Sequence, residues 1–212
     1  DADLDAAVSG TGSTWAFHAG QVCSAPTRVI AQRGVYDQVV ERLAAFARYL
    51  KVGDPLERET MVGPVITKAH HERVTGYIAS GIEAGARAVV GPDTAVPDTG
   101  WFVAPHLLAD AEPDMRVVQE EIFGPVIVAL PFDDEEEGVA VANSTDFGLY
   151  DYVWTGDAAR GAQVARRLRT GNVGINTVQR NQDAPFGGFK MSGVGRDGGE
   201  YGFAAYSELQ SL

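Results

Sequence analysis

The stretch RVIAQRGVYDQVVERLAAFARYLK, Arg28–Lys51, joins two different patterns of apolar residues. Residues 28–32 are a short β-branched run just after Pro26, which predicts a strand. From residue 37 to residue 51 the apolar side chains recur at helical spacing and would share one buried face: Val39, Val40, Leu43, Phe46, Ala47 and Leu50. A strand followed at once by an amphipathic helix is the repeating unit of an α/β fold.

The same alternation extends over most of the chain. Further strands are expected at residues 87–90, 102–109, 127–130, 152–155 and 173–176. Helices are expected at residues 4–18 with interruptions at Gly10 and Gly12, from Thr67 to about Ile82, from the acidic run at 133–137 through 142, and at 157–169. We therefore predict an α/β protein with an open, mainly parallel twisted sheet covered by helices, followed by a glycine-rich tail over residues 187–202.

Composition excludes several classes of function. The 212 residues include 17 Lys+Arg and 29 Asp+Glu, a net charge of −12. Such a chain lacks the cationic surface that binds nucleic acid or an anionic membrane. It has no apolar run of the roughly 20 residues that a membrane helix needs, and its acidic start is unlike a secretion signal. We expect a soluble, cytoplasmic protein.

The chain has one cysteine, Cys23, so no disulfide can form within it. The four histidines show no ligand spacing, which argues against a metal site. The sequence opens at Asp1 without an initiator Met, and we interpret this as the loss of an upstream segment.

Cys23 lies between an expected helix and an expected strand, three residues after Gly20. A turn there could expose the thiol to a cleft and leave the Cys23 backbone N–H free to bind an oxyanion. A buried cysteine that behaves as a small hydrophobe is an equally good interpretation of the spacing alone.

Two later segments are also unusual. In Glu120-Glu121-Ile122-Phe123-Gly124-Pro125, a carboxylate could accept hydrogen bonds from a ribose diol while the aromatic ring packs nearby; an exposed acidic pair is the simpler alternative. The other segment is Pro185-Phe186-Gly187-Gly188-Phe189-Lys190-Met191-Ser192-Gly193. The G-x-G-x-x-G pattern at residues 193–198 follows a glycine-rich loop and opens no βαβ unit, so we reject it as a dinucleotide fingerprint.

Taken in order, these segments resemble the aldehyde dehydrogenase superfamily. Phe17-x-x-x-Gly20-Gln21-x-Cys23 is similar to its cysteine motif, Glu120–Val126 to its cofactor-clamp motif, and Pro185–Gly193 to its late pocket motif. The likeness extends from Asp1 to near Leu212, and Asn143-Ser144-Thr145-x-Phe147-Gly148-Leu149 adds a further match.

The resemblance implies NAD- or NADP-dependent oxidation of a small-molecule aldehyde to a carboxylic acid, with Cys23 as the nucleophile and a thiohemiacetal and a thioester as intermediates. It also implies that Glu121 binds the nicotinamide ribose, that Phe123 packs beside it and that His70 contacts the cofactor. Phe17 and Phe186 would line the substrate pocket. Arg180 either pairs with a carboxylate on a semialdehyde substrate or faces solvent.

The resemblance further implies that residues 1–204 form the catalytic domain, in the C-terminal part of the enzyme, and that 205–212 form a strand used in homo-oligomers. The family's N-terminal NAD-binding domain, its glutamate base and its oxyanion-hole asparagine have no match in residues 1–212. We therefore expect this chain alone to bind no NAD and to be inactive. Two alternatives stay open: a truncated pseudoenzyme that serves as an oligomerisation module, and a cofactor-free thiol esterase that uses Cys23.

Overall fold

The computed structural model describes residues 1–211, which form two compact units. The larger unit is Leu4–Ser144, and the smaller unit combines Asp1–Asp3 with the chain from Thr145 onward. The larger unit holds the cysteine segment and the Glu120–Pro125 loop, whereas the smaller unit holds the late pocket motif. The assignment of residues 1–204 to one catalytic domain stays a prediction.

The larger unit is built on a four-stranded sheet in the order β1-β4-β3-β2. Its strands are β1 (Arg28–Gln32), β2 (Arg87–Val90), β3 (His106–Ala109) and β4 (Val126–Phe132). Strand β4 is parallel to both β1 and β3, and only the edge strand β2 is antiparallel. Its helices are α1 (Leu4–Ala16), the 3₁₀ turn η1 (Phe17–Gly20), α2 (Arg33–Arg48), α3 (Lys68–Glu83), α4 (Arg116–Gln119) and α5 (Glu135–Asn143).

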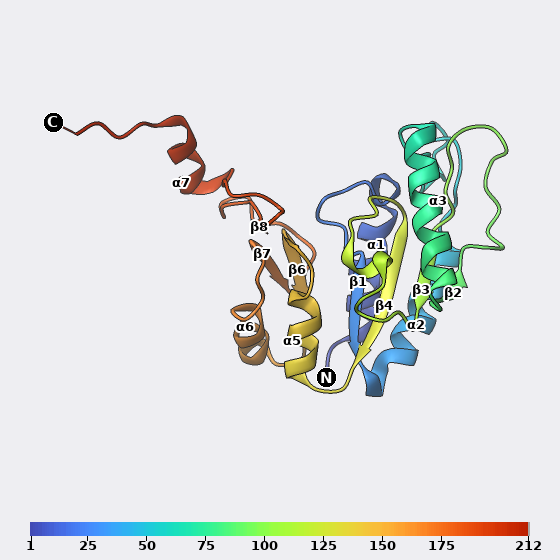
Figure 1. Ribbon diagram of the computed structural model, residues 1–212, viewed down its shortest axis with the longest axis horizontal. Coiled ribbons are helices and arrows are strands. Elements are labelled where there is room, and N and C mark those ends of the chain that lie inside the picture. The colour runs from blue at the N-terminus through green and yellow to red at the C-terminus, as the bar shows by residue number, and fades with distance from the viewer. Residues whose placement is uncertain (212) are drawn as a thin grey trace. The chain divides into compact units, whose positions relative to one another are not determined.

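Helices cover both faces of this sheet (Figure 1). Alternate residues of β4 point to opposite faces, since side chains alternate along a strand. Val126, Val128 and Leu130 pack in the cluster that contains α3 residues, whereas Ile127 and Ala129 pack in the cluster that contains α1 and α2 residues. This burial on both faces explains why β4 is an almost uninterrupted apolar run, and it confirms the predicted α/β fold class.

The strand predictions are close to the structure. The bounds expected for β1 and β2 are those observed, but β3 begins at His106 and not at residue 102. Pro105 directly precedes β3, and a proline has no N–H to donate to a sheet ladder. Residues 102–105 therefore stay outside the strand.

Two helix predictions in the larger unit were partly wrong. Helix α1 is continuous through Gly10 and Gly12. An added Cβ at Gly12 would lie 2.5 Å from the Phe46 ring, so this glycine permits close packing of α1 against α2. Helix α2 begins at Arg33, earlier than residue 37, and thereby includes the buried Tyr36. Thr67 caps α3 as expected, because its side chain accepts a hydrogen bond from the His70 backbone N–H.

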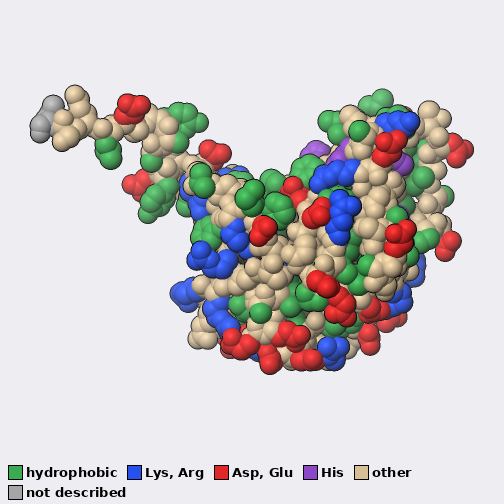
Figure 2. Space-filling model, in the orientation of Figure 1, with side chains coloured by type: hydrophobic (Ala, Val, Ile, Leu, Met, Phe, Trp, Pro, Cys, Tyr) green, Lys and Arg blue, Asp and Glu red, His purple; other side chains and the backbone are tan. Residues whose placement is uncertain are grey.

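The acidic run at residues 133–137 begins α5. The Asp134 carboxylate accepts the Glu137 backbone N–H at 2.9 Å, and the Glu137 carboxylate accepts the Asp133 N–H at 2.7 Å. Figure 2 shows acidic side chains gathered over this end of α5. The run is thus a reciprocal helix cap, in line with the helix start expected at residues 133–137.

The smaller unit contains two short sheets. Strands β6 (Tyr150–Val153) and β7 (Asn172–Ile175) pair in parallel, and β5 (Phe147–Gly148) and β8 (Phe189–Lys190) pair antiparallel. Its helices are α6 (Ala158–Ala165), α7 (Gly199–Gly202) and the 3₁₀ turn η2 (Phe203–Tyr206). Helix α6 ends at Ala165, short of the residue 169 that the sequence predicts, and Arg166 is its C-cap.

Residues 205–211 pair with no strand of the described chain, and the strand proposed for homo-oligomers at residues 205–212 stays a prediction. Residues 203–206 make the turn η2, and residues 207–211 have no regular secondary structure; residue 212 lies outside the described residues. A strand requires a neighbouring strand for its backbone hydrogen bonds, and the described chain supplies none here. Within residues 1–211, no helix is both long enough and apolar enough to cross a membrane.

Candidate functional site

Cys23 lies in an exposed turn between η1 and β1. The Ala25 backbone N–H donates to the Val22 carbonyl at 3.0 Å, which places Cys23 and Ser24 at the two central positions of the turn. The thiol is free and exposed. The Cys23 backbone N–H donates to no group among residues 1–211. Side chain and amide are therefore both available, and the buried alternative for Cys23 is wrong.

The chain that leads into this turn has a left-handed backbone. His18, Ala19 and Gly20 have φ values of 50°, 54° and 70°. Only glycine adopts such angles without steric cost, so residues 18 and 19 are strained. Gln21, the next residue, is held by two hydrogen bonds of its side chain. The side-chain carbonyl oxygen accepts the Ile66 backbone N–H at 3.1 Å, and the side-chain amide donates to the His18 carbonyl at 3.0 Å.

Gly20 packs directly against Gly124. A Cβ added at Gly20 would overlap the Gly124 carbonyl, and one added at Gly124 would lie 2.7 Å from the Val74 side chain on α3. The cysteine segment, the Glu120–Pro125 loop and α3 are therefore stacked in that order. Two motifs far apart in the sequence meet here through glycines that allow the backbones to touch.

Side chains of α3 hold the backbone of the Glu120–Pro125 loop. The His70 Nε2 lies 2.6 Å from the Phe123 carbonyl oxygen. A carbonyl can only accept, so Nε2 carries the hydrogen. The Arg73 Nη2 donates to the Glu121 carbonyl at 2.6 Å. His70, predicted to contact the cofactor, is thus bound to the loop that carries Phe123.

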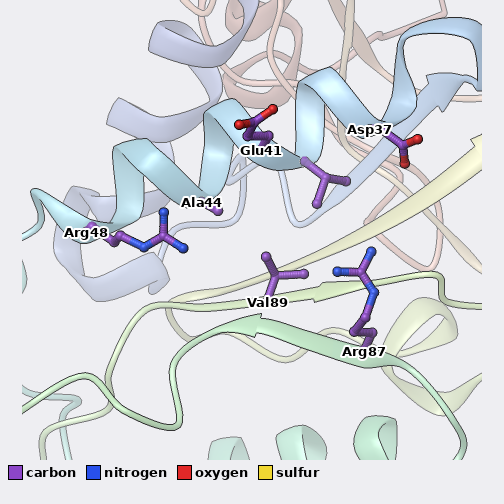
Figure 3. Close-up of a pocket in the computed structure, with 7 residues that line it drawn as sticks. Asp37, Glu41, Ala44, Arg48, Arg87 and Val89 are labelled. Atoms are coloured by element: carbon purple, nitrogen blue, oxygen red, sulfur yellow. The ribbon is translucent and has the colours of Figure 1, made fainter.

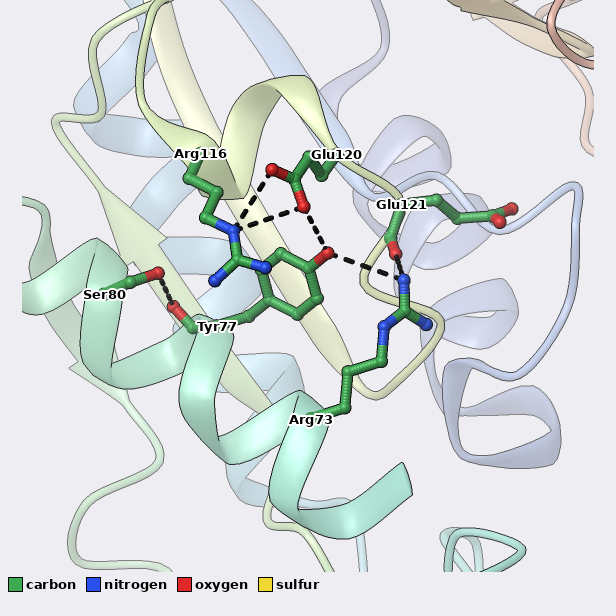
Figure 4. A network of polar contacts seen from close by, with 6 residues as sticks. All are labelled: Arg73, Tyr77, Ser80, Arg116, Glu120 and Glu121. Atoms are coloured by element: carbon green, nitrogen blue, oxygen red, sulfur yellow. Dashed lines mark hydrogen bonds and ion pairs between the residues drawn. The ribbon is translucent and has the colours of Figure 1, made fainter. Parts of the chain in front are cut away.

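Glu120 is held by a separate network (Figure 4). The Tyr77 hydroxyl donates to its carboxylate at 2.6 Å, and the Arg116 Nε donates to both carboxylate oxygens at 3.1 and 3.2 Å. The hydrogen bond from Arg116, followed by that from Tyr77, lowers the pKa of the Glu120 carboxyl. The guanidinium carbons of Arg116 and Arg73 lie 4.4 and 5.3 Å from the centre of the buried Tyr77 ring.

Glu121 differs from its neighbour because its side chain is unengaged. Its carboxylate is exposed and makes no hydrogen bond or ion pair within the described chain, and Figure 4 shows it directed away from Arg73. Phe123 is half-buried and has φ 62°. A free carboxylate beside a partly exposed ring has the chemistry required to bind a ribose diol and an adjoining flat ring. The exposed acidic pair considered from the sequence is therefore divided between a structural Glu120 and an available Glu121.

Residues predicted for the substrate pocket are divided between the units. Phe17, in the larger unit, is 56% exposed, and its ring lies 4.0 Å from that of His18. Arg180 and Phe186 belong to the smaller unit, where the Arg180 guanidinium carbon lies 4.1 Å from the centre of the Phe186 ring. Arg180 is exposed and has no hydrogen bond or ion pair with residues 1–211. It is thus stacked on an aromatic ring with its donors free.

Aromatic rings continue from Phe186 along β6. The Tyr150 ring centre lies 6.5 Å from that of Phe186 and 4.8 Å from that of Tyr152, on which it stacks. Phe186 itself is fixed by two backbone hydrogen bonds with Asp197, both 2.7 Å long. The bulky β6 residues thus form an aromatic surface within the smaller unit.

The larger unit brings together Phe17, Cys23, His70, Glu121 and Phe123 in segments that contact one another or α3. Sequence reasoning missed Arg73 and Tyr77 as supports of the Glu120–Pro125 loop. Their spacing from His70, three and seven residues, is that of one helix face and was the available signal. No group of three metal-ligating side chains occurs in the described part of the chain.

A separate open depression lies between α2 and β2 (Figure 3). It is lined by Asp37, Val40, Glu41, Ala44, Arg48, Arg87 and Val89. The Arg87 guanidinium is already bound to Asp110 at 2.7 Å. The depression contains no nucleophile and none of the predicted site residues, so it adds nothing to the chemistry of Cys23.

Comparison with known proteins gives a consistent result. The model of the aldehyde dehydrogenase family matches residues 1–212. Geranial dehydrogenase of Castellaniella defragrans is 41% identical over 212 residues, which are 100% of this chain and 44% of that protein. The chain therefore spans less than half the length of this relative.

Solved structures agree. The NAD-dependent aldehyde dehydrogenase of Sinorhizobium meliloti has a TM-score of 0.94 at 41% identity, over 98% of this chain and 42% of that one. The NAD⁺ complex of aldehyde dehydrogenase from Bacillus cereus has a TM-score of 0.95 at 43% identity, over 100% and 43%. With a family model that covers every residue, this chain belongs to the aldehyde dehydrogenase family.

Proposed function

We propose that residues 1–212 are the cysteine-bearing catalytic part of an NAD(P)-dependent enzyme that oxidises an aldehyde to a carboxylic acid. The observation that carries the proposal is the contact of Gly20 with Gly124, which joins the Cys23 segment to the loop of Glu121 and Phe123. A nucleophile and a cofactor-binding carboxylate must lie close together if one substrate carbon is to meet both.

Cys23 acts as the nucleophile. Its thiolate attacks the aldehyde carbon to give a thiohemiacetal, and its backbone N–H donates to the oxygen on which negative charge develops. The exposed thiol and the unpartnered amide support this role. Oxidation at the same carbon leaves a thioester on Cys23, which water hydrolyses to release the acid and the thiol.

Glu121 and Phe123 hold the nicotinamide end of the cofactor. The free carboxylate of Glu121 accepts hydrogen bonds from the ribose hydroxyls, and the Phe123 ring packs beside them. The bound nicotinamide supplies the acceptor for the hydride. The exposed, unpaired state of Glu121 fits this use, since Glu120 is already occupied by Arg116 and Tyr77.

The substrate meets aromatic side chains and one cation. In the larger unit, Phe17 is the aromatic side chain proposed to contact the substrate. In the smaller unit, Phe186 and Arg180 are proposed to contact the substrate, with Arg180 binding a carboxylate on a semialdehyde. The free donors of Arg180 above the Phe186 ring support this assignment over a purely solvent-facing role.

Alkylation of Cys23 tests the proposed nucleophile. Peptide mapping by mass spectrometry would follow the labelling rate with iodoacetamide in the native chain and in the chain unfolded in urea. We expect several-fold faster labelling in the native state, because the fold holds the thiol exposed in the turn between η1 and β1. Equal or slower native labelling would identify Cys23 as a structural thiol and overturn the proposal.

We further propose that the reaction needs parts of the enzyme beyond these residues. The purified 212-residue chain, mixed with NAD⁺ and a panel of aldehydes, should form no NADH above the level of a Cys23→Ser control. Loss of a general base alone costs roughly 10²- to 10⁴-fold in rate. Turnover by the chain that the Cys23→Ser variant lacks would show that residues 1–212 suffice.

A further inference from the structure

The Glu120–Pro125 loop is shaped by α3 more than by its own hydrogen bonds. Three consecutive carbonyls of the loop face α3 side chains: the Arg73 Nη2 lies 2.6 Å from the Glu121 oxygen, the Arg73 Nη1 3.5 Å from the Ile122 oxygen, and the His70 Nε2 2.6 Å from the Phe123 oxygen. His70 and Arg73 are three residues apart, so they project from the same face of the helix.

This support holds Phe123 in an unfavourable conformation. A φ of 62° places a bulky residue in the left-handed region, which is sterically unfavourable for a residue with a Cβ. The following residue, Gly124, is confined between Gly20 and Val74, so the loop cannot relax on that side. The two α3 donors bind the carbonyls on the other side and can offset the strain.

The arrangement also explains why the Glu120 carboxylate is hydrogen-bonded whereas the adjacent Glu121 carboxylate is exposed. Arg116 and Tyr77 donate hydrogen bonds to the Glu120 carboxylate. The Arg73 Nη2 lies 3.5 Å from the Tyr77 hydroxyl and makes its shorter hydrogen bond, 2.6 Å, to the Glu121 carbonyl. Because Arg73 binds the Glu121 carbonyl, the Glu121 side chain is directed away from α3, as Figure 4 shows.

We propose that Arg73 and His70 are positioning residues. By binding the Glu121 and Phe123 carbonyls they hold Phe123 in the left-handed conformation, and this conformation directs the Phe123 ring and the Glu121 carboxylate to the cofactor. The cofactor role of these two groups rests on the proposed function, whereas the bracing by α3 can be tested without it.

The test is the backbone conformation of Phe123 in solution. In isotope-labelled protein, the intraresidue contact between amide hydrogen and Hα is short only when φ is positive. Arg73→Met and His70→Leu remove the donors and should replace the short distance at Phe123 with the longer one of a negative φ. Arg73→Lys and His70→Gln each keep one donor and should retain the short distance.

Asp110 serves as an internal standard, since its φ is 58° and its short contact should persist in every variant. Persistence of the short Phe123 contact in both Arg73→Met and His70→Leu would overturn the proposal. Should Arg73→Met fail to fold, the His70→Leu and His70→Gln pair decides. Glu121→Gln should leave the short contact at Phe123 intact. A failure of Glu121 to bind cofactor would therefore be distinguishable from a failure of Arg73 and His70 to hold the loop.

Discussion

Tyr36 ties helix α2 to the sheet through one buried hydroxyl. This hydroxyl donates to the Ala129 carbonyl at 3.2 Å and accepts the Asp110 backbone N–H at 2.7 Å. Asp110 follows β3 in a left-handed conformation, and its carboxylate binds Arg87 on β2. Burial raises the pKa of Tyr36 to about 12. A single side chain thus links α2, β4 and the end of β3.

Stability should therefore fall at alkaline pH. Unfolded tyrosine loses its proton near pH 10, whereas folded Tyr36 keeps it to about 12, so the free energy of unfolding should decline between these values by an amount of order 2 kcal/mol. Tyr36→Phe should cost about 1–2 kcal/mol at pH 7 and remove much of the alkaline decline. Urea unfolding at several pH values measures both, with exposed Tyr49→Phe as the matched control.

His106 should produce the opposite dependence at acidic pH. Desolvation lowers the pKa of its imidazole below the ordinary 6.5, and its Nδ1 donates to the Ala104 carbonyl at 2.7 Å. As pH falls below 6.5 the unfolded chain takes up a proton first, so stability declines down to the folded pKa. His106→Phe should flatten this part of the urea-unfolding profile. An unchanged slope would show that His106 titrates as an ordinary exposed histidine.

At the scale of elements, the cysteine segment, the Glu120–Pro125 loop and α3 can pack together because Gly20 and Gly124 have no side chains. Gly20→Ala would place a methyl group in the Gly124 carbonyl at a φ of 70°. We expect a loss of roughly 2–4 kcal/mol from the overlap and the backbone strain together, measured by urea unfolding. The variant should also change the rate at which Cys23 is alkylated, because the turn shifts away from the loop.

Gly76→Ala is the matched control for this prediction. Gly76 lies inside α3, and an added Cβ would meet nothing within 4 Å. Alanine there should stabilise the protein by about 0.5–1 kcal/mol. A similar response of Gly20 and Gly76 to alanine would show that the close approach of Gly20 to Gly124 does not exist in solution.

Local sequence patterns predicted most helices and strands, because residue propensities and capping side chains determine where these elements form. β-Branched runs mark β1 and β2, and Thr67 caps α3, as expected. Predictions failed where tertiary packing overrides local preference. Gly12 was expected to interrupt α1, but α1 continues through it, and the absence of a side chain there allows the Phe46 ring of α2 to pack closely.

The residues proposed for the site can be named from the sequence, whereas the contacts between their segments cannot. Cys23, Glu121 and Phe123 are recognisable from their motifs, whereas nothing in the spacing reveals that Gly20 touches Gly124. Arg73 also escaped notice, since a charged residue on an amphipathic helix is usually solvated. Its contact with the Glu121 carbonyl depends on the path of a loop that has no regular structure.

At the scale of the whole molecule, exposed apolar side chains predict self-association. Tyr201, Phe203, Tyr206 and Leu209 are each at least 69% exposed, and Figure 2 shows hydrophobic side chains along this C-terminal segment. Such groups favour an interface with another copy of the chain. Light scattering should show a mass that rises with concentration, and Phe203→Asp with Tyr206→Asp should reduce the rise. A strict monomer at high concentration would contradict this expectation.

The central proposal is that Cys23 is the nucleophile and that the rest of the larger unit holds its thiol exposed. Acyl transfer tests this claim without any cofactor, because an activated ester such as p-nitrophenyl acetate needs only a nucleophile and an oxyanion donor. Mass spectrometry of the native chain after brief exposure should find one acetyl group on Cys23 and none at that position in Cys23→Ser or in the urea-unfolded chain. Acetylation of Cys23 no faster in the native chain than in the unfolded one would contradict the account.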